Sequence, residues 1–247
     1  MKVALCLSGQ PRVVEVGYQK LKATILDNND VDIFIHTWFD PDNLSQKSVI
    51  PGRESHQLAP NALETLAQLY HPKAMLVEKP KEWKRSYGFP DKCFTSAWTW
   101  GPEVVGGLDV AKEYISNTTH CMFYSIMMAN LLKERYATET DTHYDWVIRN
   151  RIDYSPHVGI TFDVPPEDDT AFYYDHNPDH KDGMIGDWFG FGSNNVMNVY
   201  SGVFNNIGQL VRQSNSEVGY WCNELLLKHQ LNNNNINIVG GSYQVHY

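Results

Sequence analysis

The chain has few cysteines and no long apolar or basic run. Its four cysteines lie far apart, without a CxxC pair or histidines at zinc-finger spacing, so we expect reduced structural thiols. No five consecutive residues are Lys or Arg, and the net charge of -9 disfavours nucleic acid or anionic membrane as a partner. No segment approaches the roughly 18 apolar residues of a transmembrane helix, and the N-terminal apolar run is too short for a signal peptide. These absences predict a cytoplasmic protein without a transmembrane segment.

Short apolar runs alternate with helical periodicity along the chain. Runs at 3–7, 31–36 and 74–77 are typical of buried parallel strands, and the segments between them have apolar residues at helical spacing. This order predicts right-handed βαβ units and an α/β fold, with a mostly parallel central sheet flanked by helices. Further along, the patterns predict strands at 146–148, 171–174, 188–191 and 236–239, helices at 118–136, 195–211 and 217–230, and a long loop at 79–108.

The common nucleotide-binding and nucleophile motifs are missing. The turn after the first predicted strand has a single glycine, Gly9, so it is not a dinucleotide-binding GxGxxG turn. No GxxxxGK[ST] or GxSxG occurs, which excludes a P-loop kinase or ATPase and disfavours a serine hydrolase. A Rossmann-like sheet in this chain must therefore hold a ligand with other residues.

Open parallel sheets bind ligands beyond the carboxyl ends of their strands, so the residues that follow each strand are the candidates. The first predicted strand is followed by a small polar turn, and the second ends in two polar residues. These candidate nucleotide-binding residues are Ser8, Gly9, Gln10 and Arg12, then His36 and Thr37. Their N–H groups, hydroxyls, amide and guanidinium suit a nucleotide and its phosphates. A plain glycine turn with an exposed arginine remains the alternative.

The strongest single signal follows the strand at 146–148. Side chains two residues apart on a strand share a face, so Arg149, Arg151 and Asp153 are expected to project together. Guanidinium groups bind phosphate oxygens through paired hydrogen bonds, and a carboxylate can hold a divalent cation beside a diphosphate. The alternative is a structural pair in which an arginine and the aspartate satisfy one another.

Four segments together resemble a group of GT-A-type nucleotide-sugar glycosyltransferases from bacterial polysaccharide clusters and large DNA viruses, including chlorella-virus-like members. The segments are A-L-C-L-S-G-Q-P-R, D-I-F-I-H-T-W, D-W-V-I-R-N-R-I-D-Y and D-W-F-G-F-G-S. The resemblance implies a single GT-A-like Rossmann-type domain over 1–247, with a nucleotide-sugar-binding half (1–154) and an acceptor-side half (155–247). It implies a nucleoside-diphosphate sugar as donor and a glycan or glycoprotein as acceptor, in the host cytoplasm if the protein is viral.

The resemblance also implies roles for individual residues. GT-A enzymes usually carry Asp-x-Asp where this chain has Arg151-Ile152-Asp153, which leaves Asp153 as the expected ligand of Mn²⁺ or Mg²⁺, with His246 as a second. Asp187 matches the acceptor-side acid and is the expected general base, and Trp188 could stack on a sugar. Glu224 is a second base candidate. The alternatives are that Asp187 caps a turn and that Glu224 favours a helix dipole.

Two other functions fit the same residues. A metal-dependent nucleotidyltransferase or phosphodiesterase would also bind a diphosphate and a metal, but would attack phosphorus. Two-metal sites need several clustered carboxylates, which are scarce here. A non-catalytic sugar-binding module is consistent with the 7 Trp and 14 Tyr residues.

Overall fold

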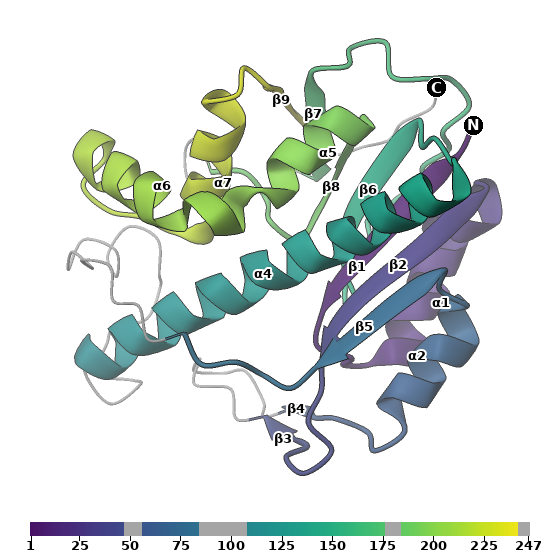
Figure 1. Ribbon diagram of the computed structural model, residues 1–247, viewed down its shortest axis with the longest axis horizontal. Coiled ribbons are helices and arrows are strands. Elements are labelled where there is room, and N and C mark those ends of the chain that lie inside the picture. The colour runs from purple at the N-terminus through teal and green to yellow at the C-terminus, as the bar shows by residue number, and fades with distance from the viewer. Residues whose placement is uncertain (47–55, 84–107, 176–183, 242–247) are drawn as a thin grey trace.

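A seven-stranded sheet forms the centre of the molecule, with the order β5-β2-β1-β6-β8-β7-β9 (Figure 1). The computed structural model describes residues 1–46, 56–83, 108–175 and 184–241. The strands are β1 (Val3–Gly9), β2 (Val31–Trp38), β5 (Ala74–Glu78), β6 (Trp146–Arg151), β7 (Ala171–Asp175), β8 (Phe189–Gly192) and β9 (Asn237–Gly241). β8 is antiparallel to β6 and β7, and the other pairs are parallel. The short strands β3 (Ser45–Gln46) and β4 (His56–Gln57) pair separately.

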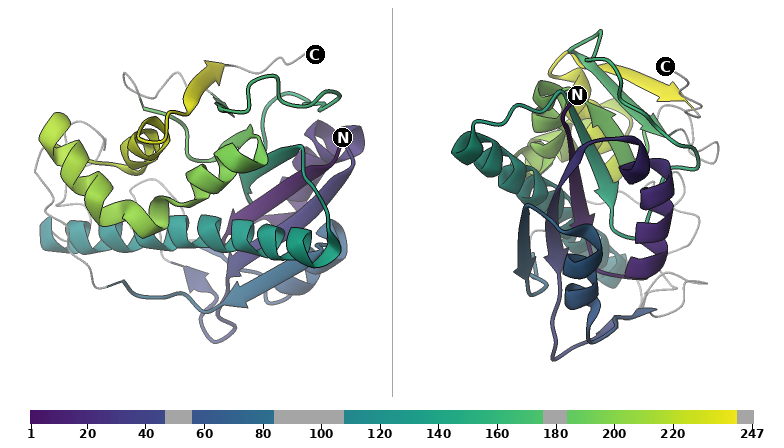
Figure 2. Two further views of the ribbon diagram at one scale, coloured as in Figure 1. Left: turned by 45° about the horizontal axis from the view of Figure 1, so that its top comes forward. Right: turned by 90° about the vertical axis from the view of Figure 1, so that its right-hand side faces the viewer.

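Helices cover both faces of the sheet (Figure 2). One face carries α1 (Val14–Thr24) and α2 (Ala62–Tyr70), with the 3₁₀ turn η1 (Leu26–Asn28) following α1. The other carries α4 (Leu108–Thr140), α5 (Asn194–Ser201), α6 (Val203–Glu217) and α7 (Asn223–Asn232). The predicted α/β architecture, a mostly parallel central sheet flanked by helices, is confirmed.

The continuous apolar run of β1 reflects its burial on both faces. Ala4 and Cys6 belong to the core beneath α4 to α7, whereas Leu5 and Leu7 belong to the core beneath α1 and α2. A strand at the centre of a parallel sheet needs apolar side chains at successive positions, because neither face meets water. β1 is therefore the strand around which the two layers of helices are built.

Helix α4 begins ten residues before the predicted start at residue 118. Its first turns extend beyond the sheet (Figure 1), so few of their side chains reach the core; Ile115 is one that does. The apolar periodicity that predicts a helix is weak there, because several positions, such as Asp109, Val110 and Glu113, are exposed. The sequence pattern therefore found only the part of α4 that packs on the sheet.

Glycines divide the late helices differently from the prediction. The helix expected at 195–211 is two helices separated at Gly202, where an added Cβ would lie 3.2 Å from the Val199 carbonyl oxygen. The helix expected at 217–230 begins only at Asn223, because Gly219 adopts φ +81° and ends the preceding turn. The predicted strands agree with the structure within one to three residues at their ends.

Candidate functional site

Two strand ends meet at the point where the strand order reverses. The chain passes from β1 to β2 on one side, and returns later as β6 on the other side of β1. In the register, Ser8 is paired with Arg151 and Gly9 with Thr37, so these three parallel strands end together. Ligands of open α/β sheets bind outside the carboxyl ends of strands at such a switch point. The structure thus brings together the strand-end residues that sequence reasoning selected separately.

The turn after β1 has an unusual backbone. Gly9 adopts φ +119°, which suits glycine, but Val13 has φ 41° and ψ 45° and is β-branched. A left-handed conformation at such a residue is a genuine outlier and costs about 1–3 kcal/mol. Between them, Arg12 donates from Nε to Gln10 Oε1 at 2.7 Å. Strain of this kind is concentrated at functional sites, and here it is adjacent to Arg12.

Arg151 and Asp153 form a bidentate ion pair. Arg151 Nε donates to Asp153 Oδ1 and Nη2 donates to Oδ2, both at 2.8 Å. Burial raises the pKa of the Asp153 carboxyl, but Arg151 and the nearby Arg12 charge outweigh it and leave the pKa below its usual value. The structural Arg–Asp pair that the sequence left open as an alternative is therefore formed.

The predicted metal ligand does not fit a divalent cation in this arrangement. Both Asp153 oxygens already accept hydrogen bonds from Arg151. The described parts of the chain contain no group of three His, Cys, Asp or Glu side chains that could hold a metal. His246, the other predicted ligand, lies outside the described residues. Mn²⁺ or Mg²⁺ at Asp153 would have to share the carboxylate with the Arg151 guanidinium, whose positive charge opposes it.

Arg149 is a buried charge with unused hydrogen-bond donors. Its side chain is 2% exposed, and Nε and Nη1 have no hydrogen-bond partner within the described ranges. Burial lowers the pKa of its guanidinium, while Tyr200 and Asp187 act in the opposite direction. A buried, unpaired guanidinium is expensive, since both desolvation and unmade hydrogen bonds oppose it. An anionic ligand would supply the missing acceptors.

We call Arg12, Arg149 and Arg151 the arginine cluster. Arg149 and Arg151 repel one another, and both are influenced by Asp153 and Asp187. The Arg151 guanidinium also lies 5.4 Å from the centre of the Trp188 ring. Trp188 contacts Tyr154 edge-on as well, so the indole predicted to stack on a sugar already has two neighbours that orient it.

Asp187 and Glu224, the two predicted catalytic acids, lie close enough to interact; we call them the carboxylate pair. Asp187 comes two residues before β8 begins, and Glu224 is in the first turn of α7. Burial first, and then the Asp187 charge, raise the pKa of Glu224 to about 7. Asp187 is 4% exposed, and its Oδ1 has no hydrogen-bond partner among the residues described. A buried carboxyl with a raised pKa, as at Glu224, is typical of catalytic acids and bases.

His36 is placed differently from the expectation that it contacts a nucleotide. Its ring is fully buried, with Nδ1 2.7 Å from Ser125 Oγ and Nε2 3.0 Å from Glu78 Oε2. Burial lowers the pKa of His36, so the neutral ring donates from Nε2 to Glu78 and accepts from Ser125. Ser125 Oγ in turn accepts from the Gly9 N–H at 3.1 Å. His36 thus supports the β1 turn from beneath.

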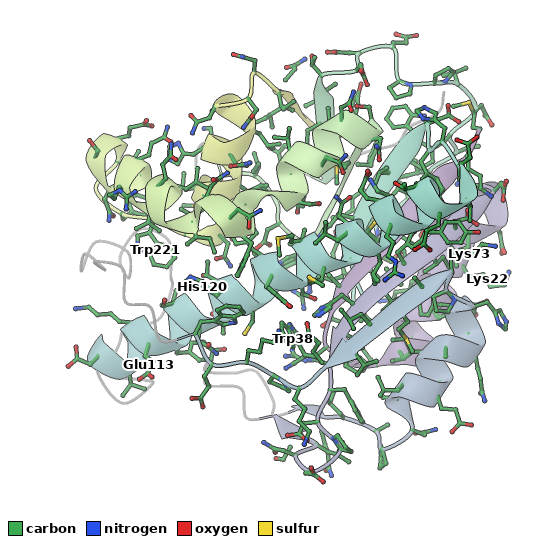
Figure 3. The ribbon with its side chains drawn as sticks, in the orientation of Figure 1. Lys22, Trp38, Lys73, Glu113, His120 and Trp221 are labelled. Carbon is green, nitrogen blue, oxygen red and sulfur yellow. The ribbon has the colours of Figure 1, made fainter. Side chains whose placement is uncertain are left out.

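Sequence reasoning missed Ser125 and Glu78, since they belong to α4 and β5, far from β1 along the chain. It also missed an aromatic cluster on the same edge. The cluster comprises Trp38, Trp83, His120, Tyr124 and Phe204, with ring centroids 4.8–6.3 Å from their neighbours or from His36. Trp38 donates from Nε1 to the Cys121 carbonyl, and Figure 3 shows it beside α4, in the same region as His120.

The remaining predicted residues are mostly buried at the base of the site. Ser8 and Thr37 are 2% and 0% exposed, and the Thr37 hydroxyl has no partner in the described structure. Gln10 is engaged by Arg12, as described above. The β1 turn therefore offers backbone and guanidinium groups, rather than these hydroxyls, to a ligand.

No protein-family model matches the chain, and no curated protein matches it significantly. Its function must therefore be argued from the site itself. Within the described ranges, no helix combines the length and the apolarity that crossing a bilayer requires. Cys6, Cys121 and Cys222 are free thiols, as expected, and Cys93 lies outside the described residues.

Proposed function

We propose that this protein is a GT-A-type glycosyltransferase that moves a sugar from a nucleoside-diphosphate sugar to a hydroxyl group of a glycan or glycoprotein. The single observation that carries the proposal is the buried Arg149 guanidinium at the switch point of the sheet, whose Nε and Nη1 have no partner among the described residues. Donors in that position call for a phosphate-bearing ligand, because the carboxyl edge of an α/β sheet is where nucleotides bind. The donor diphosphate would lie against the arginine cluster.

The carboxylate pair supplies the base that sugar transfer needs. Asp187 would accept the proton of the acceptor hydroxyl as its oxygen bonds to the anomeric carbon. The bond from that carbon to the diphosphate oxygen breaks in the same step, and the nucleoside diphosphate leaves. A single displacement of this kind inverts the anomeric centre. Glu224 titrates near neutral pH beside Asp187, so the pair can exchange the abstracted proton with water.

The arrangement of the resembling segments supports the same function. The four segments that resemble GT-A enzymes form, or directly adjoin, the strands β2, β1, β6 and β8, which are consecutive in the sheet. Residues far apart in the sequence thereby contribute to one continuous edge. A resemblance confined to one hairpin or helix would have given no common site.

The two other candidate functions have weaker support. A metal-dependent phosphodiesterase or nucleotidyltransferase needs several clustered carboxylates for its metals, whereas Asp153 is paired with Arg151 and the described residues hold no group of three possible metal ligands. A sugar-binding module has no need of a buried acid whose pKa is raised to about 7. The aromatic cluster alone would be compatible with such a module.

A donor panel tests the proposal directly. The protein is incubated with UDP-, GDP- and dTDP-sugars and a mixture of glycan acceptors, and release of nucleoside diphosphate is followed with mass analysis of the acceptor. One donor class should yield both nucleoside diphosphate and glycosylated acceptor. The Asp187→Asn variant should form both products much more slowly. Release of nucleoside monophosphate or pyrophosphate instead would favour the phosphorus-attacking alternative. Donor or sugar binding without any product would favour the binding module.

A further inference from the structure

The Asp153 carboxylate is paired with a cation, the Arg151 guanidinium. Its two oxygens accept from two nitrogens of one guanidinium, in the fork geometry that makes Arg–carboxylate pairs strong. The carboxylate is 18% and the guanidinium 29% exposed, so water screens the pair only in part. A divalent cation arriving at Asp153 would meet Arg151 in its way and the charge of Arg12 nearby.

The guanidinium groups around Asp153 favour the binding of an anion over that of a cation. Arg149 lies close enough to Arg151 to be repelled by its charge, and Arg151 and Arg12 both act on the Asp153 carboxylate at the ends of β1 and β6. Within the described residues, the Arg149 donor nitrogens Nε and Nη1 have no acceptor, and Arg151 engages Asp153 through Nε and Nη2. A diphosphate carries two to three negative charges and several oxygen acceptors, which is the complement of this set.

From these contacts we propose that the diphosphate is bound and stabilised as a leaving group by the arginine cluster without a divalent cation, and that Asp153 is a positioning residue that aims Arg151. This inference rests on the proposed function for the identity of the ligand. It replaces the metal role expected for Asp153 with an orienting one. The negative charge that develops on the leaving diphosphate oxygen is met by guanidinium N–H donors already in place.

Calorimetry with inorganic pyrophosphate, UDP, GDP and dTDP tests this inference, each titrated once in EDTA and once in excess Mg²⁺ or Mn²⁺. We expect binding in EDTA, with an affinity that the metals change by no more than about threefold, since they add no contact to this site. Arg149→Met and Arg151→Met should each weaken binding at least about tenfold, the loss expected for charge-assisted hydrogen bonds. Arg135→Met is the matched control, because Arg135 is exposed and pairs only with Glu139 in the described structure.

Asp153→Asn separates positioning from metal binding. If Asp153 aims Arg151, the substitution weakens pyrophosphate binding by the same factor in EDTA and in Mn²⁺, and Asp153→Glu restores part of it. If Asp153 holds a metal, wild-type binding appears only with Mn²⁺ or Mg²⁺, and Asp153→Asn removes only that metal-dependent part. The second pattern overturns the inference and leaves the glycosyltransferase proposal standing. If pyrophosphate binds in EDTA but UDP, GDP and dTDP bind under no condition, the anion site stands and the proposed function is rejected.

Discussion

Gly17 of α1 packs directly against the backbone of Ile152, in the turn after β6: a Cβ added to Gly17 would lie 2.4 Å from the Ile152 carbonyl oxygen. Ile152 stands between the two members of the Arg151–Asp153 ion pair. The start of α1 follows Arg12, so this contact fixes how closely the β1 turn approaches the β6 turn. Two of the three arginines are thus held relative to one another by a close backbone approach.

Gly17→Ala should therefore disturb both stability and ligand binding. The methyl group meets a backbone oxygen that cannot rotate away, so we expect a loss of about 1–3 kcal/mol in the free energy of unfolding, measured in urea. Pyrophosphate affinity should fall as the two turns separate. Gly159→Ala is the control, since its Cβ would make an ordinary 3.5 Å contact with Asn28 Nδ2. Lower stability with unchanged affinity would show that the contact does not set the arginine geometry.

Arg149→Met should uncouple binding from stability. Methionine fills much of the same volume without a buried charge, so the free energy of unfolding should stay constant or rise by about 1 kcal/mol, a rise in Tm of about 2–4 °C. Anion binding should be lost in the same variant. Thermal unfolding and calorimetry on one preparation give both quantities. A Tm that falls by several degrees would mean that the Arg149 guanidinium stabilises the folded protein through a structural partner and does not serve a ligand.

Glu224 should make the protein less stable as the pH rises. Its pKa is about 7 in the folded state against 4.5 for an ordinary glutamate, so between these values the folded protein holds a proton that the unfolded chain has released. Stability is greatest below about pH 4.5 for this group and falls by about 1–3 kcal/mol as the pH approaches 7. Glu224→Gln should reduce the dependence of the free energy of unfolding on pH, measured in urea between about pH 5 and pH 8. Glu64→Gln, at an exposed position, is the control and should leave that dependence unchanged.

Asp187→Asn tests the general base. A positioned base is worth about 10²–10⁴ in rate, so kcat should fall by that factor while donor affinity is retained. The amide preserves the shape of the side chain, and Asp187 Oδ1 has no described partner to lose. If the carboxylate only caps a turn, Tm falls and turnover per folded molecule stays near that of the wild type. Steady-state kinetics and melting on the same variant decide between the two roles.

The fold was largely predictable because its central strands are buried on both faces. β1, β2 and β6 are short apolar runs that end in polar residues, and a reader of the sequence finds both the strands and their ends. The first turns of α4 were not found, since they extend past the sheet and carry few core residues.

The sequence indicated the strand-end residues of the candidate site, but neither their pairings nor the residues that α4 and β5 contribute. The alternation of side chains along the strand predicted Arg149 and Arg151 to be neighbours. It did not predict whether the Asp153 carboxylate would bind a ligand or pair with Arg151. That choice depends on the turn at Ile152, which no periodicity describes. The contact between Ser125 and His36 joins residues 89 apart, and a serine inside a helix gives no signal of it.

Val13 indicates where this protein could most readily be engineered. A valine in the left-handed region stores about 1–3 kcal/mol that asparagine or glycine would release, since both tolerate that conformation. Its side chain is 54% exposed, so replacing it removes little packing. Val13 is therefore a first position at which to raise the stability of the protein. Anion binding should be measured on the same variant, because a relaxed backbone at residue 13 can change the position of the neighbouring Arg12 guanidinium.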